Sequence, residues 1–281
     1  MHVAGTARLG PDYQPCQYGR SKVSFRGPRV EPEGRYLVYL GGNETFGRFI
    51  EEPFPVLVSR AVGLPAINLG CVNAGLDLYV KDSSLLEIIA RAETVVIQIM
   101  GAQNMSNRFY AVHPRRNDRF LRASMTLKAL YPEVDFTEYH FTRHLLMALR
   151  AQSPRCFDLV VEELRAAWVA RMRGLIEQVT GRAILLWLSD RAPEDDAEEL
   201  TPGGEPLLVN REMLNALADT GAQLVEHVAS PAEIASGREA MVFSEIEQAV
   251  AREMLGPRVH ADVAARLVPF FAPRDELKRP A

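Results

Sequence analysis

The stretch Gly41-Gly42-Asn43-Glu44-Thr45-Phe46-Gly47 is the part of the sequence that decides the fold we expect. It directly follows a short apolar run, Tyr36–Leu40, and it precedes a segment with helical character. A short apolar run bounded by glycines and polar residues is typical of a buried parallel strand. The stretch therefore predicts a strand, a tight turn and the beginning of a helix.

Segments of the same two kinds alternate along the rest of the chain. The other strand candidates are Ala66–Leu69, Thr94–Met100, Ala183–Leu188 and Leu224–Val228, and the helix candidates are Pro53–Val62, Ser83–Ala92, Phe157–Val179, Arg211–Ala218, Ser244–Leu255 and Val259–Phe270. Ser83 or Ser84 is available as the N-cap of the second helix. Alternation of this kind implies a parallel sheet covered by helices on both faces. We therefore expect an α/β fold, a three-layer α/β/α sandwich with a flavodoxin-like central parallel sheet of about five strands.

The chain is expected to form one large domain. Residues 1–34 are rich in Gly, Pro and Arg and predict an irregular arm laid over the surface, while residues 35–281 predict a single α/β domain. An insertion at about 106–155 is long enough to cap the carboxyl ends of the strands, where ligands bind in such folds. The acidic, turn-rich residues 191–206 predict an exposed loop without chemistry.

Composition excludes several classes of function. The 281 residues carry a net charge of −4, which gives no general case for binding nucleic acid or a membrane surface. No apolar run approaches the roughly 20 residues of a membrane span, and the N-terminus lacks the pattern of a signal peptide. The three cysteines show neither zinc spacing nor a disulfide framework. We therefore expect a cytoplasmic protein without metal or cofactor, and a homo-oligomer remains an alternative to a monomer.

The opening stretch resembles the motif G-D-S-x-T-x-G with which the SGNH (GDSL-type) hydrolases begin. Gly41, Thr45 and Gly47 match the motif, and Asn43 stands where the family has its nucleophilic serine. The resemblance covers the core of the chain, from about residue 35 to residue 270, at low sequence similarity. It implies an SGNH-like form of the three-layer sandwich, in a divergent member whose nucleophile is replaced.

Three later segments resemble the other parts of the family pattern. Asn68–Gly75 resembles the Asn-x-Gly run after the second strand, and Gly101–Asn104 resembles the Gly-x-Asn after the third, with Gln103 at the asparagine position. Pro257–His260 keeps the histidine of the family's Asp-x-x-His, with proline at the aspartate position. In the family the serine attacks an acyl carbon, the histidine accepts its proton, and the glycine and asparagine donors stabilise the oxyanion.

The resemblance implies a catalytic group made of His260, the surviving base, with Asn43 and Glu44. The groups that it places around the reacting oxygen or the substrate are Gly42, Thr45, Gly75, Gln103, Asn104 and Asn107. Structural roles are the alternative: Asn43 as a helix cap, Glu44 in a capping box, and His260 as a cap or surface residue. An acidic partner for His260 has to come from elsewhere in the chain, and Asp77, Glu44 and Asp262 are the candidates.

Residues 104–122 combine arginines with aromatic side chains, directly after the third predicted strand. The residues expected to bind an anion are Arg108, His113, Arg115, Arg116 and Arg119, joined by Arg143 from later in the chain. Arginine binds phosphate, sulfate and carboxylate groups through paired hydrogen bonds. The alternative is a solvated loop whose arginines pair with carboxylates such as Asp118.

Two other features point to chemistry less directly. His140 and His144 are four residues apart, so on a helix they share one face. With Asp135 or Glu138 they predict either a metal site or, as the favoured alternative, a polar lid over the pocket. Cys71 at a strand end is an alternative nucleophile or simply a small buried residue.

Three functions follow from these observations. The first is an enzyme that acts on, or transfers a group to, an acylated or anionic carbohydrate-type small molecule, with His260 deprotonating a substrate hydroxyl. The second is a non-catalytic binding or accessory protein with the same fold. The third is a nucleotide- or sulfonucleotide-dependent transferase centred on the arginine-rich loop, which the absence of a G-x-x-x-x-G-K-[ST] phosphate loop from the sequence weakens.

Overall fold

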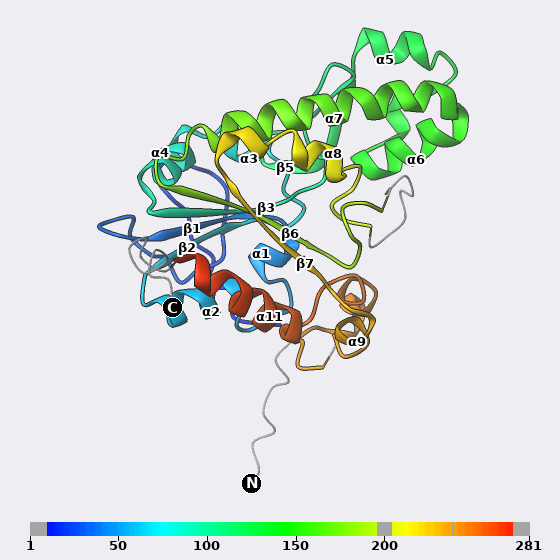
Figure 1. Ribbon diagram of the computed structural model, residues 1–281. Helices are drawn as coiled ribbons and strands as arrows, with labels where there is room; N and C mark the ends of the chain where they lie inside the picture. Colours follow the sequence, from blue (N-terminus) through cyan, green and yellow to red (C-terminus); the bar gives the residue numbers. More distant parts are fainter. Residues whose placement is uncertain (1–9, 196–203, 238, 272–281) are drawn as a thin grey trace.

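The computed structural model describes residues 10–195, 204–237 and 239–271. At its centre lies a five-stranded parallel sheet in the order β2-β1-β3-β6-β7. The strands are β1 (Leu37–Gly41), β2 (Ala66–Gly70), β3 (Thr94–Gln98), β6 (Arg182–Ser189) and β7 (Gln223–Val228). Helices cover both faces of the sheet, so the predicted three-layer α/β/α sandwich is confirmed (Figure 1).

The order of the strands places a switch point beside β1. The connection from β1 to β2 passes over one face of the sheet, and the connection from β2 to β3 passes over the other (Figure 1). Ligands of doubly wound sheets bind at such a point, at the carboxyl ends of the strands. Every residue of β1 and β3 is buried, because these strands lie inside the sheet with a helical layer on each face.

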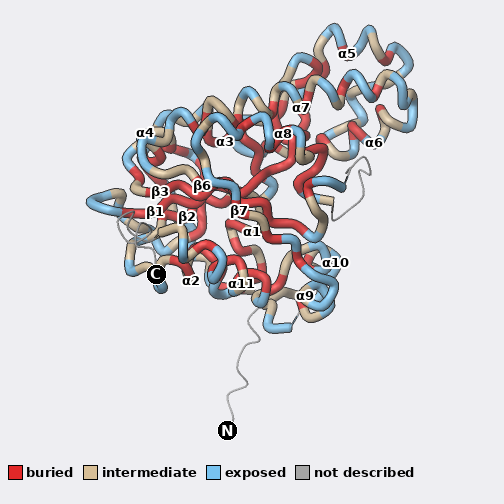
Figure 2. The backbone as a smooth tube through the Cα atoms, viewed as in Figure 1, coloured by how far each residue is buried: buried red, intermediate tan, exposed pale blue. Residues whose placement is uncertain are grey.

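The two helical layers form separate hydrophobic cores against the sheet, which Figure 2 shows as a buried centre between exposed outer surfaces. One face carries α3 (Asp77–Val80), α4 (Ser83–Arg91), α7 (Pro154–Ile176) and α8 (Arg211–Asn215), and the other carries α2 (Phe54–Val62) and α11 (Pro257–Leu267). The buried stripe of α7 recurs at helical spacing and includes Val160, Leu164 and Trp168. The Trp168 indole donates a hydrogen bond of 2.8 Å to the Met100 carbonyl, which ties α7 to the segment after β3.

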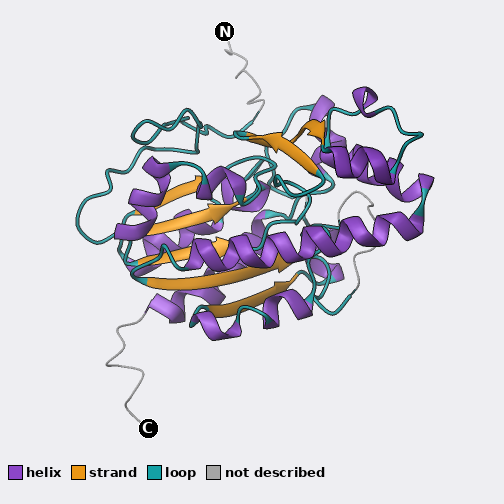
Figure 3. Ribbon diagram, turned by 90° about the horizontal axis from the view of Figure 1, so that it is seen from above, coloured by secondary structure: helices purple, strands orange, loops and turns teal. Residues whose placement is uncertain are grey.

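The insertion between β3 and β6 folds beside the outer half of α7 (Figures 1 and 3). Its elements are the antiparallel hairpin of β4 (Tyr110–His113) and β5 (Arg116–Ala123), the helices α5 (Met125–Leu130) and α6 (Thr142–Gln152), and the 3-10 turn η1 (Phe136–Glu138). The hairpin was not predicted from the sequence, because β5 is rich in arginine instead of being apolar. The shared helix face expected for His140 and His144 was wrong, because α6 begins only after an extended Phe141.

The remaining elements are short. They are α1 (Asn43–Phe46), η2 (Ala218–Thr220), α9 (Pro231–Ala235), η3 (Glu245–Glu247), α10 (Gln248–Ala251) and η4 (Val268–Phe271). The single helix predicted over Ser244–Leu255 was wrong, since only η3 and α10 form there. The serine cap predicted for α4 was also wrong, because the Asp82 carboxylate accepts hydrogen bonds from the Ser84 and Leu85 amides. Within the three described ranges, no helix combines the length and the apolar composition of a membrane span.

The N-terminal arm, described from residue 10 to residue 34, enters the core as well as lying on the surface. Phe25 is 1% exposed and belongs to the larger hydrophobic core. The buried Arg26 guanidinium donates hydrogen bonds to the carbonyls of Gly47 (2.6 Å) and Glu51 (2.7 Å). These bonds fix the segment that follows α1, so the arm supports the part of the chain that begins the candidate site.

Candidate functional site

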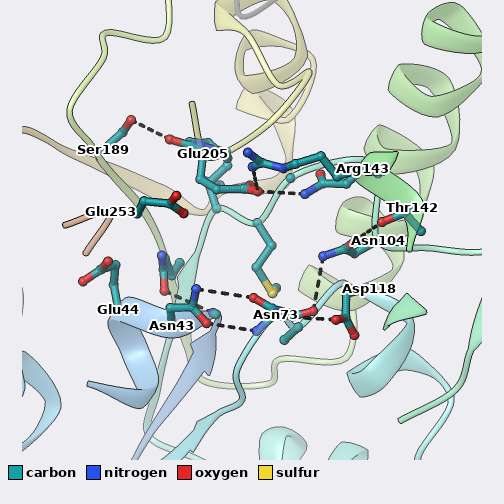
Figure 4. Close-up of a pocket in the computed structure, with 18 of the residues that line it drawn as sticks. Asn43, Glu44, Asn73, Asn104, Asp118, Thr142, Arg143, Ser189, Glu205 and Glu253 are labelled. Atoms are coloured by element: carbon teal, nitrogen blue, oxygen red, sulfur yellow. Dashed lines mark hydrogen bonds and ion pairs between the residues drawn. The ribbon is translucent and has the colours of Figure 1, made fainter. Parts of the chain in front are cut away.

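A cavity of about 530 Å³ lies at the carboxyl ends of the parallel strands. Its walls come from the segments after β1, β2, β3 and β6, from the first turns of α6, and from residues 205–206 and 253–255 (Figure 4). The sequence analysis expected the segments after the first three strands to meet. The structure brings residues 42–44 and 73–74 and most of 98–104 to this cavity.

The turn after β1 is held by Gln98, the last residue of β3. Its Oε1 accepts hydrogen bonds from the Gly42 amide (3.2 Å), the Thr45 amide (3.1 Å) and the Thr45 hydroxyl (2.6 Å). A Cβ atom on Gly41 would lie only 2.2 Å from the Thr45 hydroxyl oxygen, so the end of the strand requires glycine here. The donors of Gly42 and Thr45, which we expected near the substrate, are therefore directed at Gln98.

Three asparagines link the segments after β1, β2 and β3. The Asn73 amide donates to Asn43 Oδ1 (3.0 Å), and Asn43 Nδ2 donates to Asn73 Oδ1 (3.4 Å). Asn104 Nδ2 donates to the Asn73 carbonyl (3.2 Å), and Asn104 Oδ1 accepts from the Thr142 hydroxyl (2.7 Å) of α6. Asn73 has a positive φ of 56°, a conformation that asparagine tolerates better than most residues. Asn43 therefore joins a network across the cavity wall, and its side chain makes no capping bond to α1.

His260 and Glu44 meet behind this turn. His260 is fully buried in the first half of α11, with its ring stacked on Phe54 at a centroid distance of 5.8 Å. Its Nδ1 accepts a hydrogen bond of 3.2 Å from the Phe54 amide, so the neutral imidazole carries its proton on Nε2. That Nε2 faces Glu44 Oε2 at 3.3 Å, a short contact without hydrogen-bond alignment. Glu44 Oε1 accepts from the Leu255 amide at 3.2 Å.

Of the three acidic partners considered for His260, only Glu44 contacts it among the residues that the structure describes. Asp77 is buried on α3, where Arg171 Nε lies 2.9 Å from its Oδ1 and Lys81 pairs with its other oxygen. Glu44 lines the cavity and His260 does not. The Glu44 carboxylate therefore faces the cavity, and the His260 imidazole lies behind it.

Carboxylates dominate the charged lining. The titratable side chains of the wall are Glu44, Asp118, Asp190, Glu205 and Glu253, together with Arg143 and His144. Glu205 Oε1 accepts hydrogen bonds from Gln103 Nε2 (2.9 Å) and Arg143 Nη2 (2.8 Å), as Figure 4 shows in part. Five carboxylates thus stand against one guanidinium in the described lining, and the field in the cavity favours positive charge.

Gly75 and Asn107 do not line the cavity. The Gly75 amide donates to Asn117 Oδ1 at 3.0 Å, and a Cβ atom at Gly75 would lie 1.7 Å from the Asn104 carbonyl oxygen. Asn107 Oδ1 accepts hydrogen bonds from the amides of Phe109 and Tyr110 at the start of the hairpin. The two residues shape the backbone around the site, while Gln103 and Asn104 do line the cavity.

Most of the residues expected to bind an anion lie elsewhere. Arg108 pairs with Glu163 of α7 at 3.3 Å, and the Arg119 guanidinium lies 4.2 Å from the centre of the Phe141 ring. The His113 ring accepts hydrogen bonds from the amides of Arg115 and Arg116 at the tip of the hairpin. Of these six residues, all of which the structure describes, Arg143 alone lines the cavity.

Cys71 and the histidines of the insertion were the remaining candidates. His144, expected in a polar lid over the pocket, lines the cavity, and His140 does not. Burial, with a smaller contribution from Asp118, raises the pKa of the Cys71 thiol to about 11, so the reactive thiolate is scarce at neutral pH. No cluster of three or more metal-binding side chains occurs in residues 10–195, 204–237 and 239–271.

The strand order and the helices on both faces define a doubly wound α/β/α protein, the fold that the sequence resemblance implied. The chain belongs to the family described as a domain of unknown function (DUF6473), whose model matches residues 1–274. No curated protein matches the chain.

Similar solved structures include a lipolytic protein, a lipase/acylhydrolase and an acetylxylan esterase. One, from Desulfitobacterium hafniense, is described as lipolytic and of the G-D-S-L family, with 11% identity, a TM-score of 0.42, and coverage of 84% of this chain and 98% of the other. A lipase/acylhydrolase from Enterococcus faecalis has 12% identity, a TM-score of 0.44, and coverage of 84% and 95%. A catalytic mutant of an acetylxylan esterase from Geobacillus stearothermophilus has 13% identity, a TM-score of 0.45, and coverage of 85% and 95%.

Several lining residues were missed from the sequence. They are Asn73, Gln98, Asp118, Thr142, Ser189, Asp190, Glu205 and Glu253. Gln98 carried a usable signal, since it is a polar residue at the end of an otherwise apolar strand. The interpretation of residues 191–206 as a loop without chemistry needs correction at its C-terminal end, because Glu205 and Pro206 line the cavity. Residues 196–203 of that predicted loop lie outside the described residues. Spacing along the sequence does not reveal that residue 205 lies beside the segment after β3.

Proposed function

We propose that this protein is an enzyme that acts on a hydroxyl group of a carbohydrate-type small molecule, with Glu44 as general base. The observation that supports this role is the placement of the Glu44 carboxylate. It lines the cavity next to Asn43, at the position that follows the nucleophile in SGNH hydrolases. It accepts a hydrogen bond from the Leu255 amide and lies in contact with the His260 ring. A carboxylate positioned in this way within a cavity is suited to proton transfer.

We assign the base to Glu44 instead of His260 for a geometric reason. Both ring nitrogens of His260 face protein groups, and the buried ring does not line the cavity. In the neutral tautomer that accepts from the Phe54 amide, His260 has no lone pair left for a substrate proton. Its role in the proposal is to position the Glu44 carboxylate.

The proposed reaction transfers an acyl group without a covalent enzyme intermediate. Glu44 accepts the proton of a water or substrate hydroxyl while that oxygen forms a bond to the acyl carbon. The bond from the acyl carbon to the leaving oxygen then breaks, and the leaving oxygen takes the proton from Glu44. Asn43 contributes hydrogen bonds only, because an amide is not a nucleophile comparable to an activated serine.

The lining suits a hydroxyl-rich ligand. The carboxylates accept hydrogen bonds from hydroxyls, and the side-chain amides both donate to them and accept from them. Phe141 and Met147 offer apolar surface at the same cavity. Phe141 is 42% exposed and Met147 is 50% exposed, so both are accessible. The excess of carboxylates counts against an anionic carbohydrate, a nucleotide or a sulfonucleotide as the ligand of this cavity.

The test compares the wild-type protein with Glu44→Gln on 4-nitrophenyl acetate and on acetylated xylo-oligosaccharides. We expect the wild type to turn over at least one acetylated sugar and the variant to lose about 100-fold or more in kcat, the range for a general base. Glu133→Gln, which changes an exposed carboxylate of the insertion, is the matched control and retains full activity. Turnover that survives Glu44→Gln overturns the proposal.

A specific observation favours a second function, a binding protein without catalysis. The amide donors around the replaced serine are bonded to other protein groups: Asn43 to Asn73, Asn104 to the Asn73 carbonyl, and Gln103 to Glu205. An oxyanion site needs donors directed at the reacting oxygen. Saturable binding of an acetylated sugar without any product, measured by calorimetry and chromatography, would establish this function in place of the enzyme.

A further inference from the structure

We infer that the ligand of the cavity carries a protonated amine, which Gln103 and Glu205 receive. The inference rests on the proposed function and narrows its carbohydrate-type ligand to an amine-bearing one, such as an amino sugar. Three observations carry it: an unpartnered buried acceptor, the convergence of two acceptor oxygens, and the charge of the surrounding wall.

The first observation is an acceptor without a donor. Gln103 is 3% exposed and lines the cavity, and its Nε2 donates to Glu205. Its Oε1 is buried and has no hydrogen-bond partner among the residues that the structure describes. Buried polar atoms are almost always paired, so an unpaired one in a cavity wall indicates the place of a ligand's donor. Because Nε2 already donates to Glu205, the atom that remains to be paired is Oε1. A ligand group that pairs with it has to be an N–H or O–H donor.

The second observation is the closeness of two acceptor oxygens beside Gly101. A Cβ atom on Gly101 would collide with Gln103 Oε1 at 2.1 Å and with Glu205 Oε2 at 2.7 Å. Glycine at this position therefore allows both acceptor oxygens to lie against the same point of the backbone in the cavity wall. Glu205 Oε2 also accepts from the Leu207 amide at 3.0 Å, which fixes the carboxylate in place. A group with several donors and no acceptor matches this arrangement, and an ammonium has three N–H donors.

The third observation, charge, distinguishes an ammonium from a hydroxyl. Arg143 pairs with Glu205 and offsets one carboxylate of the wall. The other carboxylates are Glu44, Asp118, Asp190 and Glu253, and none of them has a lysine or arginine partner among the described residues of the lining. Glu44 and Glu253 lie on the same side of the cavity in Figure 4. Partial exclusion of water strengthens this field, so a cationic donor is bound more tightly than a neutral one of the same shape.

The experiment uses three sugars that share a ring and differ in charge: glucosamine, glucose and glucuronate. Their binding to the full chain is measured by calorimetry at low salt and about pH 6, where an aliphatic amine is protonated. We expect glucosamine to bind about tenfold more tightly than glucose, with glucuronate the weakest. Added salt should reduce the differences in affinity between the three sugars, because screening weakens charge interactions.

Variants of Glu253 and Gln103 test whether these residues cause the preference for glucosamine over glucose. Glu253 is exposed, so Glu253→Gln removes one charge from the cavity wall without disturbing the core of the fold. It should reduce glucosamine affinity about threefold or more and should reduce glucose affinity by less, because glucose carries no charge. Gln103→Leu should remove most of the preference for glucosamine, and Glu133→Gln on the outer surface should change neither affinity.

The outcomes separate this inference from the proposed function. If glucose and glucosamine bind equally, the amine inference is overturned and the hydroxyl-directed function stands. If no sugar binds and no acetylated sugar is turned over, both fail. If the preference for glucosamine survives unchanged in both Glu253→Gln and Gln103→Leu, the amine binds elsewhere and the assignment to Gln103 and Glu205 is wrong.

Discussion

Asn43 shows how one substitution changes what its neighbours can do. A serine hydroxyl needs a base with a free lone pair, but His260 Nδ1 accepts from the Phe54 amide and Nε2 faces Glu44. Asn43 instead exchanges two hydrogen bonds with Asn73. The side chain at this position therefore joins two loops. In the proposed reaction the general base is the carboxylate of the next residue, Glu44.

A prediction at the residue scale follows for Asn43→Ser. Restoring the hydroxyl should not create an esterase with a serine nucleophile, because the serine would lack a base. The variant should lose about 1 kcal/mol of unfolding free energy with the two hydrogen bonds to Asn73. Labelling with a fluorophosphonate, followed by mass spectrometry, checks the first expectation. A covalent adduct at position 43 would show that His260 can reach the hydroxyl after all.

Some residues of the site could be predicted from the sequence, and others could not. Asn43, Gln103 and Asn104 were found because the motifs after the strands resemble a known pattern. Glu44 was found with them, but its contact with His260 depends on how α11 packs against α2, and spacing along the chain does not determine that packing. Glu253 had no local signal, since an exposed glutamate beside a short helix is ordinary.

At the scale of elements, the strands and helices predicted correctly are those in which burial is reflected in the spacing of apolar residues along the sequence. All five strands of the main sheet and the helices α2, α4, α7 and α11 correspond to predicted segments within a few residues. The hairpin of β4 and β5 was missed, because its register comes from pairing and its arginines obscure the strand pattern. The short helix α10 was predicted too long. Ala251 is buried but Ile246 is 93% exposed, so the apolar residues of the predicted segment do not form one continuous buried face.

The junction of β7 and α9 makes stability depend on pH. His227 Nε2 lies 3.1 Å from Glu233 Oε1, with Asp262 and Arg266 of α11 nearby. Burial is the main cause that lowers the pKa of His227, and hydrogen bonds from Ser230 lower the pKa of Glu233 to about 2. Both folded pKa values lie below the unfolded values, so the unfolded state takes up protons first as the pH falls.

The corresponding prediction concerns acid unfolding. The His227 contribution is complete above pH 6.5 and declines below it, while the Glu233 contribution is complete above pH 4.5 and is lost toward pH 2. His227→Gln should therefore flatten the fall in melting temperature below pH 6.5. Thermal melts in a buffer series check this. Equal slopes in the wild type and the variant would show that His227 does not contribute.

At the scale of the whole molecule, the N-terminal arm and the α/β body share one core. Phe25 belongs to the same hydrophobic cluster as the central strands, and Arg26 hydrogen-bonds the segment after α1. The sequence predicted an arm on the surface because these residues show no periodicity, yet an irregular segment can still bury single aromatic side chains. The arm is thus part of what stabilises the site.

The prediction at this scale is a global loss of stability from one change in the arm. Phe25→Ala should reduce the free energy of unfolding by about 3–5 kcal/mol, as expected for a buried phenylalanine. Glu33→Ala, an exposed change in the same arm, should alter it by less than about 0.5 kcal/mol. Urea unfolding followed by circular dichroism measures both. A loss below about 1 kcal/mol for Phe25→Ala would mean that the arm detaches from the body.

The contacts of Glu44 and His260 also bear on how the protein is made. Glu44 is bonded to the Leu255 amide across 211 residues, and the Phe54 amide is bonded to His260 across 206. During translation the strand and turn that carry Glu44 leave the ribosome long before α11 does. A nascent chain stalled before α11 would expose the Phe54 side of the sheet and hold Glu44 without its partners. The carboxylate at the centre of the proposal is thus positioned only when nearly the whole described chain has been synthesised.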